Sequence, residues 1–283
     1  MLPALARRAI ETYSDPGDLV VDPMCGIGTT LVEAADLERR AVGVELEGRW
    51  AKLAATNLDK ARADGRARAQ ARVIQGEASQ LPRLLSTDAQ DLLHRAGRHT
   101  GGKLARMAYG HVDLILTSPP YACEIADICA DIRNKSEPLR RHDTTNYSPD
   151  RRNLGHARGN AYLTAMAEIY RVCAATLKPG GFFVCVTKNM RARGALCNLS
   201  GDTIALCESA GLLYWQHVIG LLATVRDSEL LLRPSLWQTL HVRRYRARGD
   251  RTQVAAHEDV LVFRKPLPSR SNPSAATARR RAA

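Results

Sequence analysis

Short runs of apolar residues alternate with longer stretches of helical periodicity along most of the chain. The apolar runs predict strands at residues 19–23, 41–46, 72–75, 112–117, 182–187 and 259–264. Helical periodicity is clearest at residues 4–13, 162–177 and 201–210. Alternation of this kind is typical of α/β proteins, so we predict a doubly wound, mostly parallel sheet with helices between the strands.

Two polar stretches interrupt this alternation. Residues 84–111 lie between the third and fourth predicted strands, and residues 124–160 follow the fourth. Long polar segments of this kind are commonly binding loops beside a functional site. The last stretch, residues 266–283, is rich in Ser, Pro, Ala and Arg, and we predict a disordered basic tail there.

The length, apolar content and cysteine spacing of the chain indicate which class of protein it belongs to. A chain of 283 residues with 45% apolar side chains can bury a full core, which fits one large α/β domain. No apolar run is long enough to span a membrane and no basic-then-apolar leader opens the chain, so we predict a cytoplasmic protein. The seven cysteines contain no Cys-x-x-Cys pair, which favours reduced core thiols over metal ligands or disulfides.

The net charge of +12 is concentrated in three segments. Residues 133–158 hold seven Arg or Lys against three acids, and residues 239–251 hold five Arg against one acid. Residues 264–283 hold six basic residues and no acid. Because these segments lie outside the predicted core, we predict that they bind a polyanion, and nucleic acid is the natural candidate. Trp215 lies outside these segments, and we expect it to pack in the core rather than to stack on nucleic acid.

A glycine-rich loop follows the first predicted strand. Gly26 and Gly28 allow a tight turn, and the helix that begins after them directs unpaired N–H groups toward the same place. The second predicted strand ends in Glu45, where an α/β nucleotide site places a carboxylate for ribose hydroxyls. The third ends near Glu77, which is either an adenine contact or a surface charge. Together these features predict a nucleotide-like cofactor.

The fourth predicted strand runs into Thr117-Ser118-Pro119-Pro120-Tyr121. Neither proline can donate a backbone hydrogen bond, so the strand must end in a stiff loop there. A hydroxyl and nearby carbonyl groups can accept hydrogens from an amine, while Tyr121 can stack on a planar ring. This loop therefore predicts a site for a planar group that carries an amine.

These motifs resemble those of the amino-directed DNA methyltransferases, which use S-adenosylmethionine to methylate exocyclic amines of cytosine or adenine. Residues 22–30 look like their cofactor loop, 41–45 like their ribose-binding strand, 117–121 like their catalytic loop and 257–265 like their closing strand. The resemblance implies a methyltransferase domain over residues 1–265, with 220–256 as a target-recognition region. It also implies a seven-stranded Rossmann-like methyltransferase sheet whose last strand is antiparallel.

The resemblance assigns roles to individual residues. The catalytic residues it implies are Ser118, Pro119, Pro120 and Tyr121. The cofactor-binding residues are Asp22, Pro23, Cys25, Gly26, Gly28, Thr29, Thr30, Glu45, Glu77 and Thr117. The basic segments add candidate nucleic-acid contacts at Arg140, Arg141, Arg151, Arg152, Arg243, Arg244 and Arg246, and no metal site is expected. Serine at position 118 favours cytosine N4 over adenine N6, because the family's adenine enzymes mostly carry Asp or Asn there.

Several interpretations stay open at this point. The partner is expected to be DNA with its target base rotated out of the stack, and a restriction nuclease partner is conceivable within the family. A base-amine methyltransferase acting on RNA is an alternative, and so is a catalytically inactive relative that binds nucleic acid. Carbon-5 methylation of cytosine is disfavoured, because the chain contains no Pro-Cys dipeptide to supply the nucleophile.

Overall fold

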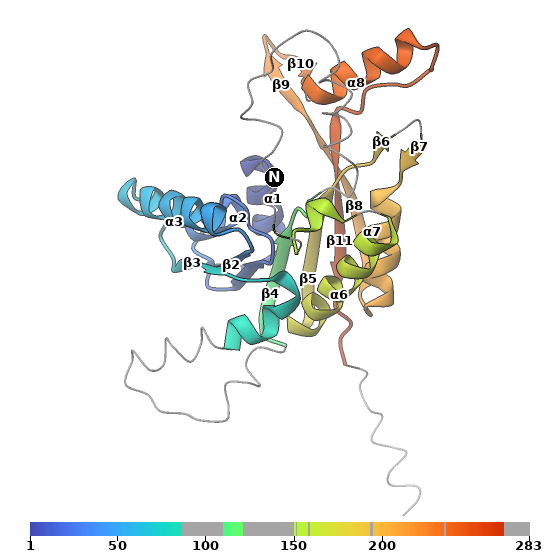
Figure 1. Ribbon diagram of the computed structural model, residues 1–283. Coiled ribbons are helices and arrows are strands. Elements are labelled where there is room, and N and C mark those ends of the chain that lie inside the picture. The colour runs from blue at the N-terminus through green and yellow to red at the C-terminus, as the bar shows by residue number, and fades with distance from the viewer. Residues whose placement is uncertain are drawn as a thin grey trace, which may run out of the picture.

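The computed structural model describes residues 1–86, 110–120, 150, 152–157, 159–192, 195–234 and 236–268. A seven-stranded sheet forms the middle layer, and helices cover both of its faces (Figure 1). The strand order is β3-β2-β1-β4-β5-β11-β8. The strands are β1 (Leu19–Asp22), β2 (Arg40–Glu45), β3 (Ala71–Gln75), β4 (Val112–Thr117), β5 (Leu177–Thr187), β8 (Leu213–Leu221) and β11 (His257–Arg264).

Strands β1 to β5 are mutually parallel, whereas β11 runs antiparallel to both of its neighbours, β5 and β8. The predicted mostly parallel sheet with an antiparallel last strand is therefore confirmed. The helices are α1 (Pro3–Tyr13), α2 (Thr29–Asp36), α3 (Gly48–Ala63), α6 (Asn160–Thr176), α7 (Leu199–Ser209) and α8 (Leu236–Ala247), with short 3₁₀ turns η1 (Ala78–Gln80) and η2 (Leu154–His156). Helix α2 lies between β1 and β2 along the chain, α3 between β2 and β3, and α6 between β4 and β5, in keeping with the crossover that parallel neighbours require.

The core has two halves because successive side chains of a strand point to opposite faces of the sheet. Helices α1, α2 and α3 pack on the face that contains Val20, Leu114 and Val184. Helices α6 and α7 pack on the other face, together with residues 81–85 and the alternate strand positions Ile115 and Phe183. Both faces of the central strands are buried, which explains why these strands read as unbroken apolar runs in the sequence.

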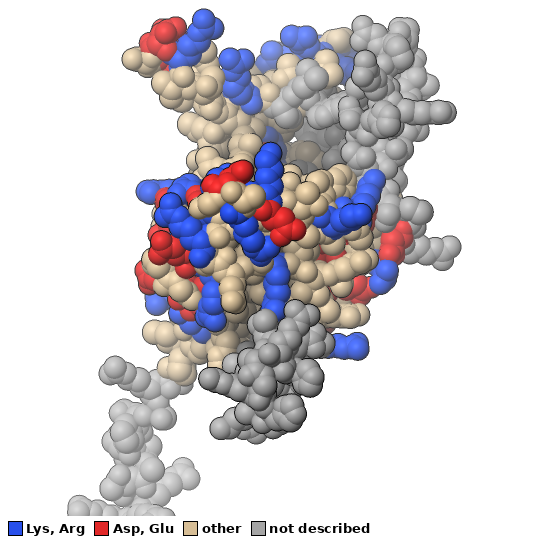
Figure 2. Space-filling model, turned by 90° about the vertical axis from the view of Figure 1, so that its left-hand side faces the viewer, with Lys and Arg blue, Asp and Glu red and all other residues tan. Residues whose placement is uncertain are grey.

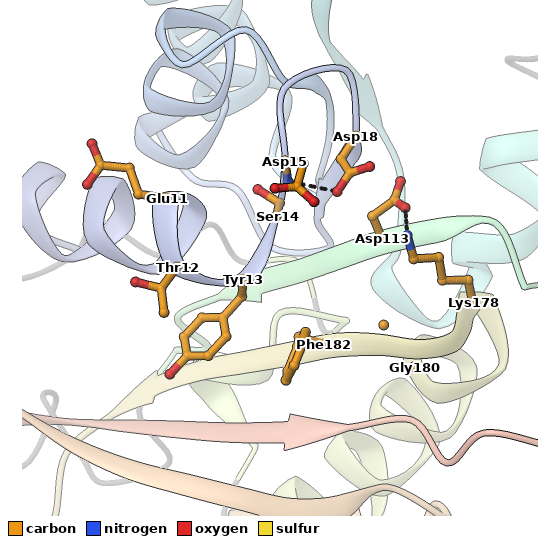
Figure 3. Close-up of a pocket in the computed structure, with 11 residues that line it drawn as sticks. Glu11, Thr12, Tyr13, Ser14, Asp15, Asp18, Asp113, Lys178, Gly180 and Phe182 are labelled. Carbon is orange, nitrogen blue, oxygen red and sulfur yellow. Dashed lines mark hydrogen bonds and ion pairs between the residues drawn. The ribbon is translucent and has the colours of Figure 1, made fainter.

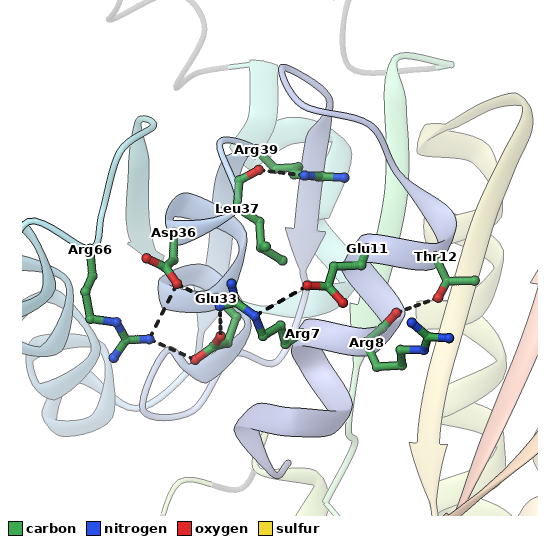
Figure 4. A network of polar contacts seen from close by, with 9 residues as sticks. All are labelled: Arg7, Arg8, Glu11, Thr12, Glu33, Asp36, Leu37, Arg39 and Arg66. Carbon is green, nitrogen blue, oxygen red and sulfur yellow. Dashed lines mark hydrogen bonds and ion pairs between the residues drawn. The ribbon is translucent and has the colours of Figure 1, made fainter.

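A polar network fixes α1 to α2 on the first of these faces (Figure 4). The Arg7 guanidinium donates to Glu33 at 3.1 Å and to Asp36 at 2.7 Å, and Arg66 reaches Glu33 from the turn after α3 at 3.2 Å. Glu33 is only 6% exposed, so its carboxylate depends on these two arginines for compensation of the lost hydration. The network holds the three helices in a fixed arrangement beside β1 and β2.

Residues 222–256 project from the edge of the sheet at which the parallel strands end (Figure 1). They form a two-stranded hairpin, β9 (Ala223–Arg226) and β10 (Glu229–Leu232), followed by α8. A second small hairpin, β6 (Met190–Ala192) and β7 (Ala195–Cys197), follows β5 at the same edge. The predicted target-recognition region is thus a separate structural extension of the sheet, and its role stays a prediction.

Three further sequence expectations can be compared with the structure. Cys25, Cys173, Cys185 and Cys207 are free and buried, whereas Cys197 is disulfide-bonded, so the prediction of reduced thiols is wrong for that residue. Trp215 was expected in the core, yet it is 53% exposed because β8 is the last strand of the sheet. Every helix within the described residues is too short or too polar to cross a membrane.

Candidate functional site

The glycine-rich loop and the Ser-Pro-Pro loop emerge from neighbouring strands. β1 pairs in parallel with β4, with Val20 opposite Leu114 and Val21 opposite Ile115. The carboxyl ends of both strands therefore meet at one edge of the sheet, next to the end of β2, which pairs with β1 on its other side. Ligands of open α/β sheets bind in the crevice outside the carboxyl ends of the strands. The order of β1 and β4 brings the two predicted motifs to this crevice.

Asp22 anchors the glycine-rich loop from inside the protein. Its carboxylate accepts hydrogen bonds from the Thr30 hydroxyl at 2.6 Å and from the backbone N–H of Met24 at 3.1 Å. The side chain is only 3% exposed, and this burial raises the pKa of Asp22 to about 6, against the lowering effect of the Thr30 hydrogen bond. These contacts show that Asp22 fixes the glycine-rich loop.

The rest of the loop is held against β2. Gly26 has φ +52° and Gly28 has φ +83°, values that L side chains rarely adopt, and α2 begins directly after them. The backbone N–H of Cys25 donates to the Val44 carbonyl at 2.9 Å. The Cys25 thiol is buried, which raises its pKa well above the usual range and makes it a packing group and a poor nucleophile.

Glu45 stands at the end of β2, in contact with the same loop. One of its carboxylate oxygens accepts from the N–H of Gly26 and the other from the N–H of Glu47, both at 2.9 Å. Partial burial raises the pKa of Glu45 despite these hydrogen bonds. Each carboxylate oxygen has a second lone pair, so Glu45 can still accept hydrogen bonds from a ligand that lies beside Gly26.

At the end of β4, the backbone of the Ser-Pro-Pro loop is held by a tyrosine. Tyr162, at the start of α6, is 1% exposed and donates its hydroxyl hydrogen to the Pro120 carbonyl at 2.9 Å. Pro119 is buried, whereas Ser118 is partly exposed and can meet a ligand. The buried Thr117 hydroxyl lowers the pKa of Asp22, although the two groups do not meet hydrogen-bond geometry. Tyr121 lies outside the described residues.

Residues 152 and 153 contact the segments that follow β2 and β3. The Asn153 amide donates to the buried Glu47 carboxylate at 2.5 Å, and Arg152 pairs with both Glu77 and Asp150. Arg152 was predicted to contact nucleic acid, and Glu77 to contact adenine or solvent, but in the structure the two side chains pair with each other at 3.1 Å. Arg152 is thus already partnered by two carboxylates.

Sequence reasoning missed Tyr162, Asn153 and Glu47. A tyrosine at the start of an apolar helical stripe was a usable signal for Tyr162, because a buried phenol usually needs a hydrogen-bond acceptor. Asn153 and Glu47 are 106 residues apart along the chain, and no local pattern connects them.

Three of the predicted nucleic-acid contacts lie on α8. The side chains of Arg243 and Arg246 are exposed and that of Arg244 is partly exposed. Arg246 is engaged by the Thr252 carbonyl and the Gln253 side chain, whereas Arg243 and Arg244 make no ion pair with any described residue. Arg140, Arg141 and Arg151 lie outside the part of the chain that the structure describes.

A pocket of about 240 Å³ lies at the opposite edge of the sheet, where β1, β4 and β5 begin (Figure 3). Carboxylates dominate its lining, with Lys178 paired to Asp113 and a wall of Tyr13 and Phe182. It contains none of the predicted site residues, and its negative charge is unsuited to a polyanion. Among the described residues, no group of three or more His, Cys, Asp or Glu side chains could hold a metal ion.

Comparisons with known proteins add independent information. The sequence profile of a DNA methylase family, the N6/N4 type, matches residues 3–56. Type II methyltransferase M.SmaI of Serratia marcescens is 45% identical over 51 residues, which cover 18% of this chain and 18% of that protein. DNA adenine methyltransferase YhdJ of Escherichia coli K12 is 38% identical over 58 residues, which cover 20% of each chain. The matched stretches thus span only about a fifth of these relatives.

Among solved structures, the [4+2]-cyclase SpnF superposes with a TM-score of 0.50 at 13% identity, covering 94% of this chain and 82% of that one. A likeness at this identity supports the fold and carries no information about activity. The matching residues 3–56 contain α1, β1, the glycine-rich loop, α2, β2 and the first half of α3. The resemblance to the amino-directed DNA methyltransferases is therefore confirmed over residues 3–56, which include the glycine-rich loop and Glu45.

Proposed function

We propose that the chain is an S-adenosylmethionine-dependent DNA methyltransferase that methylates an exocyclic amine, with cytosine N4 favoured over adenine N6. The observation that carries this proposal is the adjacency of β1 and β4, because it places the loop after Asp22 beside the loop that holds Ser118. One loop has the features of a nucleotide-like cofactor site and the other those of an amine site.

The residues of the first loop fit S-adenosylmethionine. The first N–H groups of α2 have no acceptor within the helix, and they can receive the carboxylate of the cofactor's methionine part. Glu45 retains acceptor capacity for the ribose hydroxyls beside Gly26. Thr117 offers a buried hydroxyl that makes no hydrogen bond of standard geometry within the described residues. When bound, the cofactor supplies an activated methyl group on a sulfonium centre.

The residues of the second loop position the acceptor amine. An exocyclic amine is conjugated into its ring and is therefore a poor nucleophile. If the Ser118 hydroxyl and the Pro119 carbonyl accept its hydrogens, the nitrogen becomes more pyramidal and its lone pair more available. The hydrogen bond from Tyr162 to Pro120 keeps this stretch of backbone in place. No strongly perturbed base is needed, because the amine proton becomes acidic once the methyl group is attached.

The extension formed by residues 222–256 supports DNA as the substrate. It holds seven Arg against three acids, and it projects from the same edge of the sheet as the two loops. At the top of the molecule several Lys and Arg side chains lie near one acidic group, and Lys, Arg, Asp and Glu mix on the face below (Figure 2). A basic surface beside the crevice can bind the phosphates around the target base. A restriction nuclease partner is part of the same proposal.

Incubation of the protein with plasmid DNA and isotope-labelled S-adenosylmethionine, followed by nucleoside mass spectrometry, tests the proposal. We expect labelled N4-methylcytosine from the wild type and from a Ser209→Ala control, and almost none from Ser118→Ala. Labelled N6-methyladenine would overturn the preference for cytosine. Label on transfer RNA alone would overturn DNA as the substrate, and cofactor binding without transfer to either would favour an inactive binder.

A further inference from the structure

The two edges of the central sheet differ in a way that points to an interaction surface. At one edge, β3 is a five-residue strand that contains Arg72 and mostly half-buried side chains. At the other edge, β8 is a nine-residue strand in which every residue except Gly220 is exposed. The exposed large apolar side chains of β8 are Leu213, Tyr214, Trp215, Val218, Ile219 and Leu221.

Within the part of the chain that the structure describes, β8 also leaves backbone groups without partners. It pairs with β11 on one side only, so the amide and carbonyl groups of its other side point away from the sheet. Natural edge strands are usually short, or carry Lys or Pro, because an open edge is a template for pairing with another chain. β8 has none of these protections, since residues 213–225 contain no Lys, Arg, Asp, Glu or Pro.

The partner of this edge must be an extended and uncharged chain. DNA is unsuitable, because residues 213–225 offer no cation to a phosphate. Residues 266–283 of the same chain are also unsuitable, because Leu267 is their only large apolar residue and four arginines accompany it. β8 of a second copy of the chain is both extended and uncharged. A two-fold contact brings a strand against its own copy, and an uncharged strand meets no like-charge repulsion there.

We propose that β8 of one protomer pairs antiparallel with β8 of a second copy, so that the chain forms a dimer with one continuous sheet. The apolar residues are present on both faces of the strand. Trp215 packs toward the α1 side, with its ring 6.3 Å from that of Phe182, whereas Tyr214 packs on the opposite side with its ring 5.4 Å from that of Phe263. Antiparallel pairing therefore buries apolar side chains above and below the joined sheet.

The dimer is compatible with the proposed methyltransferase site and does not depend on it. β8 is separated from β4 by β11 and β5, so a contact at this edge leaves the crevice outside β1 and β4 open. The oligomeric state can be measured without cofactor or DNA, and failure of the dimer would therefore leave the proposed activity untouched.

Analytical ultracentrifugation over a range of protein concentrations tests the dimer. For the wild type we expect a mass twice the 31.1 kDa of one chain, falling to 31.1 kDa on dilution. Ile219→Lys should remain at the mass of one chain at every concentration, because it places an ammonium group in the apolar contact between the two strands, and a charge on an edge strand opposes pairing with another chain. The matched control is Leu53→Lys on α3, which changes a 39% exposed side chain far from β8 and should dimerise as the wild type does.

Hydrogen exchange of the wild type gives a second measurement that needs no variant. The β8 amides that do not bond to β11 should exchange more slowly at high than at low protein concentration, while those of the β9–β10 hairpin should not change. A wild type that is monomeric at tens of micromolar, a dimer that survives Ile219→Lys, or protection confined to another surface would overturn the proposal.

Discussion

Replacement of Asp22 by asparagine isolates the free-energy cost of a buried carboxylate under the cofactor loop. Asp22 is 3% exposed and receives hydrogen bonds from Thr30 and from the N–H of Met24. An asparagine amide has nearly the same shape and can keep both contacts, since its oxygen can accept from Met24 and its NH₂ can donate to the Thr30 hydroxyl. The substitution therefore removes a charge with little change in packing.

The magnitude follows from the pKa of Asp22, which burial raises from 3.8 to about 6. A shift of about two units corresponds to about 3 kcal/mol. Because the folded state holds the proton more tightly than the unfolded state, the free energy of unfolding falls as pH rises through the window between these two pKa values. The loss is complete above about pH 7. Asp22→Asn has no such titration, so its stability relative to the wild type should rise by about 1.5 kcal/mol between pH 5 and pH 7.5.

Urea unfolding of the wild type and Asp22→Asn at intervals from pH 5 to pH 7.5 measures this difference. The exposed Asp59→Asn serves as the matched control, because its side chain is 73% exposed and its removal should leave the pH dependence unchanged. A constant difference between the wild type and Asp22→Asn across this range would show that Asp22 does not titrate there, and the argument from burial would fail.

Two single substitutions and one double substitution test the crevice and the basic extension. Ser118→Ala should lower kcat by about 10²-fold, since one positioned acceptor is lost, while calorimetry shows unchanged affinity for S-adenosylmethionine; an equal loss of cofactor affinity would contradict the assigned pocket. Tyr162→Phe leaves the Pro120 carbonyl without its donor, so it should cost about 1 kcal/mol in urea unfolding and lower kcat more than it changes KM. Joint replacement of Arg243 and Arg244 by glutamine should reduce the salt slope of DNA binding by about 2, and an unaltered slope would move the DNA surface elsewhere.

The sequence was most informative where a local pattern has a local cause. Buried parallel strands are apolar on both faces, so β1, β2, β4 and β5 could be recognised as short apolar runs. The turns at Gly26 and Gly28 and the strand end at Pro119 follow from backbone sterics alone. The number of strands and the antiparallel last strand, in contrast, came only from the resemblance, and the strand order came only from the structure, because apolar runs do not specify which strands are neighbours.

Features that depend on distant parts of the chain were missed or misjudged. The counts of basic residues included Arg152 among free cations, but the fold brings it to the carboxylate of Glu77, 75 residues away. Trp215 was assigned to the core because apolar periodicity does not distinguish the last strand of a sheet from a central one. In the first case the fold supplies a partner for Arg152, and in the second it leaves Trp215 on a strand with no further strand beside it. Both facts depend on tertiary structure, which local sequence does not specify.

Gly43 lies under the cofactor loop and shows how little freedom that loop retains. A Cβ atom at this position of β2 would lie 2.7 Å from the Cys25 sulfur, and one at Gly28 would lie 3.1 Å from the Ala54 side chain. The loop is therefore packed tightly between β2 and α3 without any ligand. A receptor built this way loses little conformational entropy when it is filled, so more of each contact's free energy remains as affinity. Bulkier residues at either glycine should therefore make the loop less rigid and should also narrow the ligand site beside it.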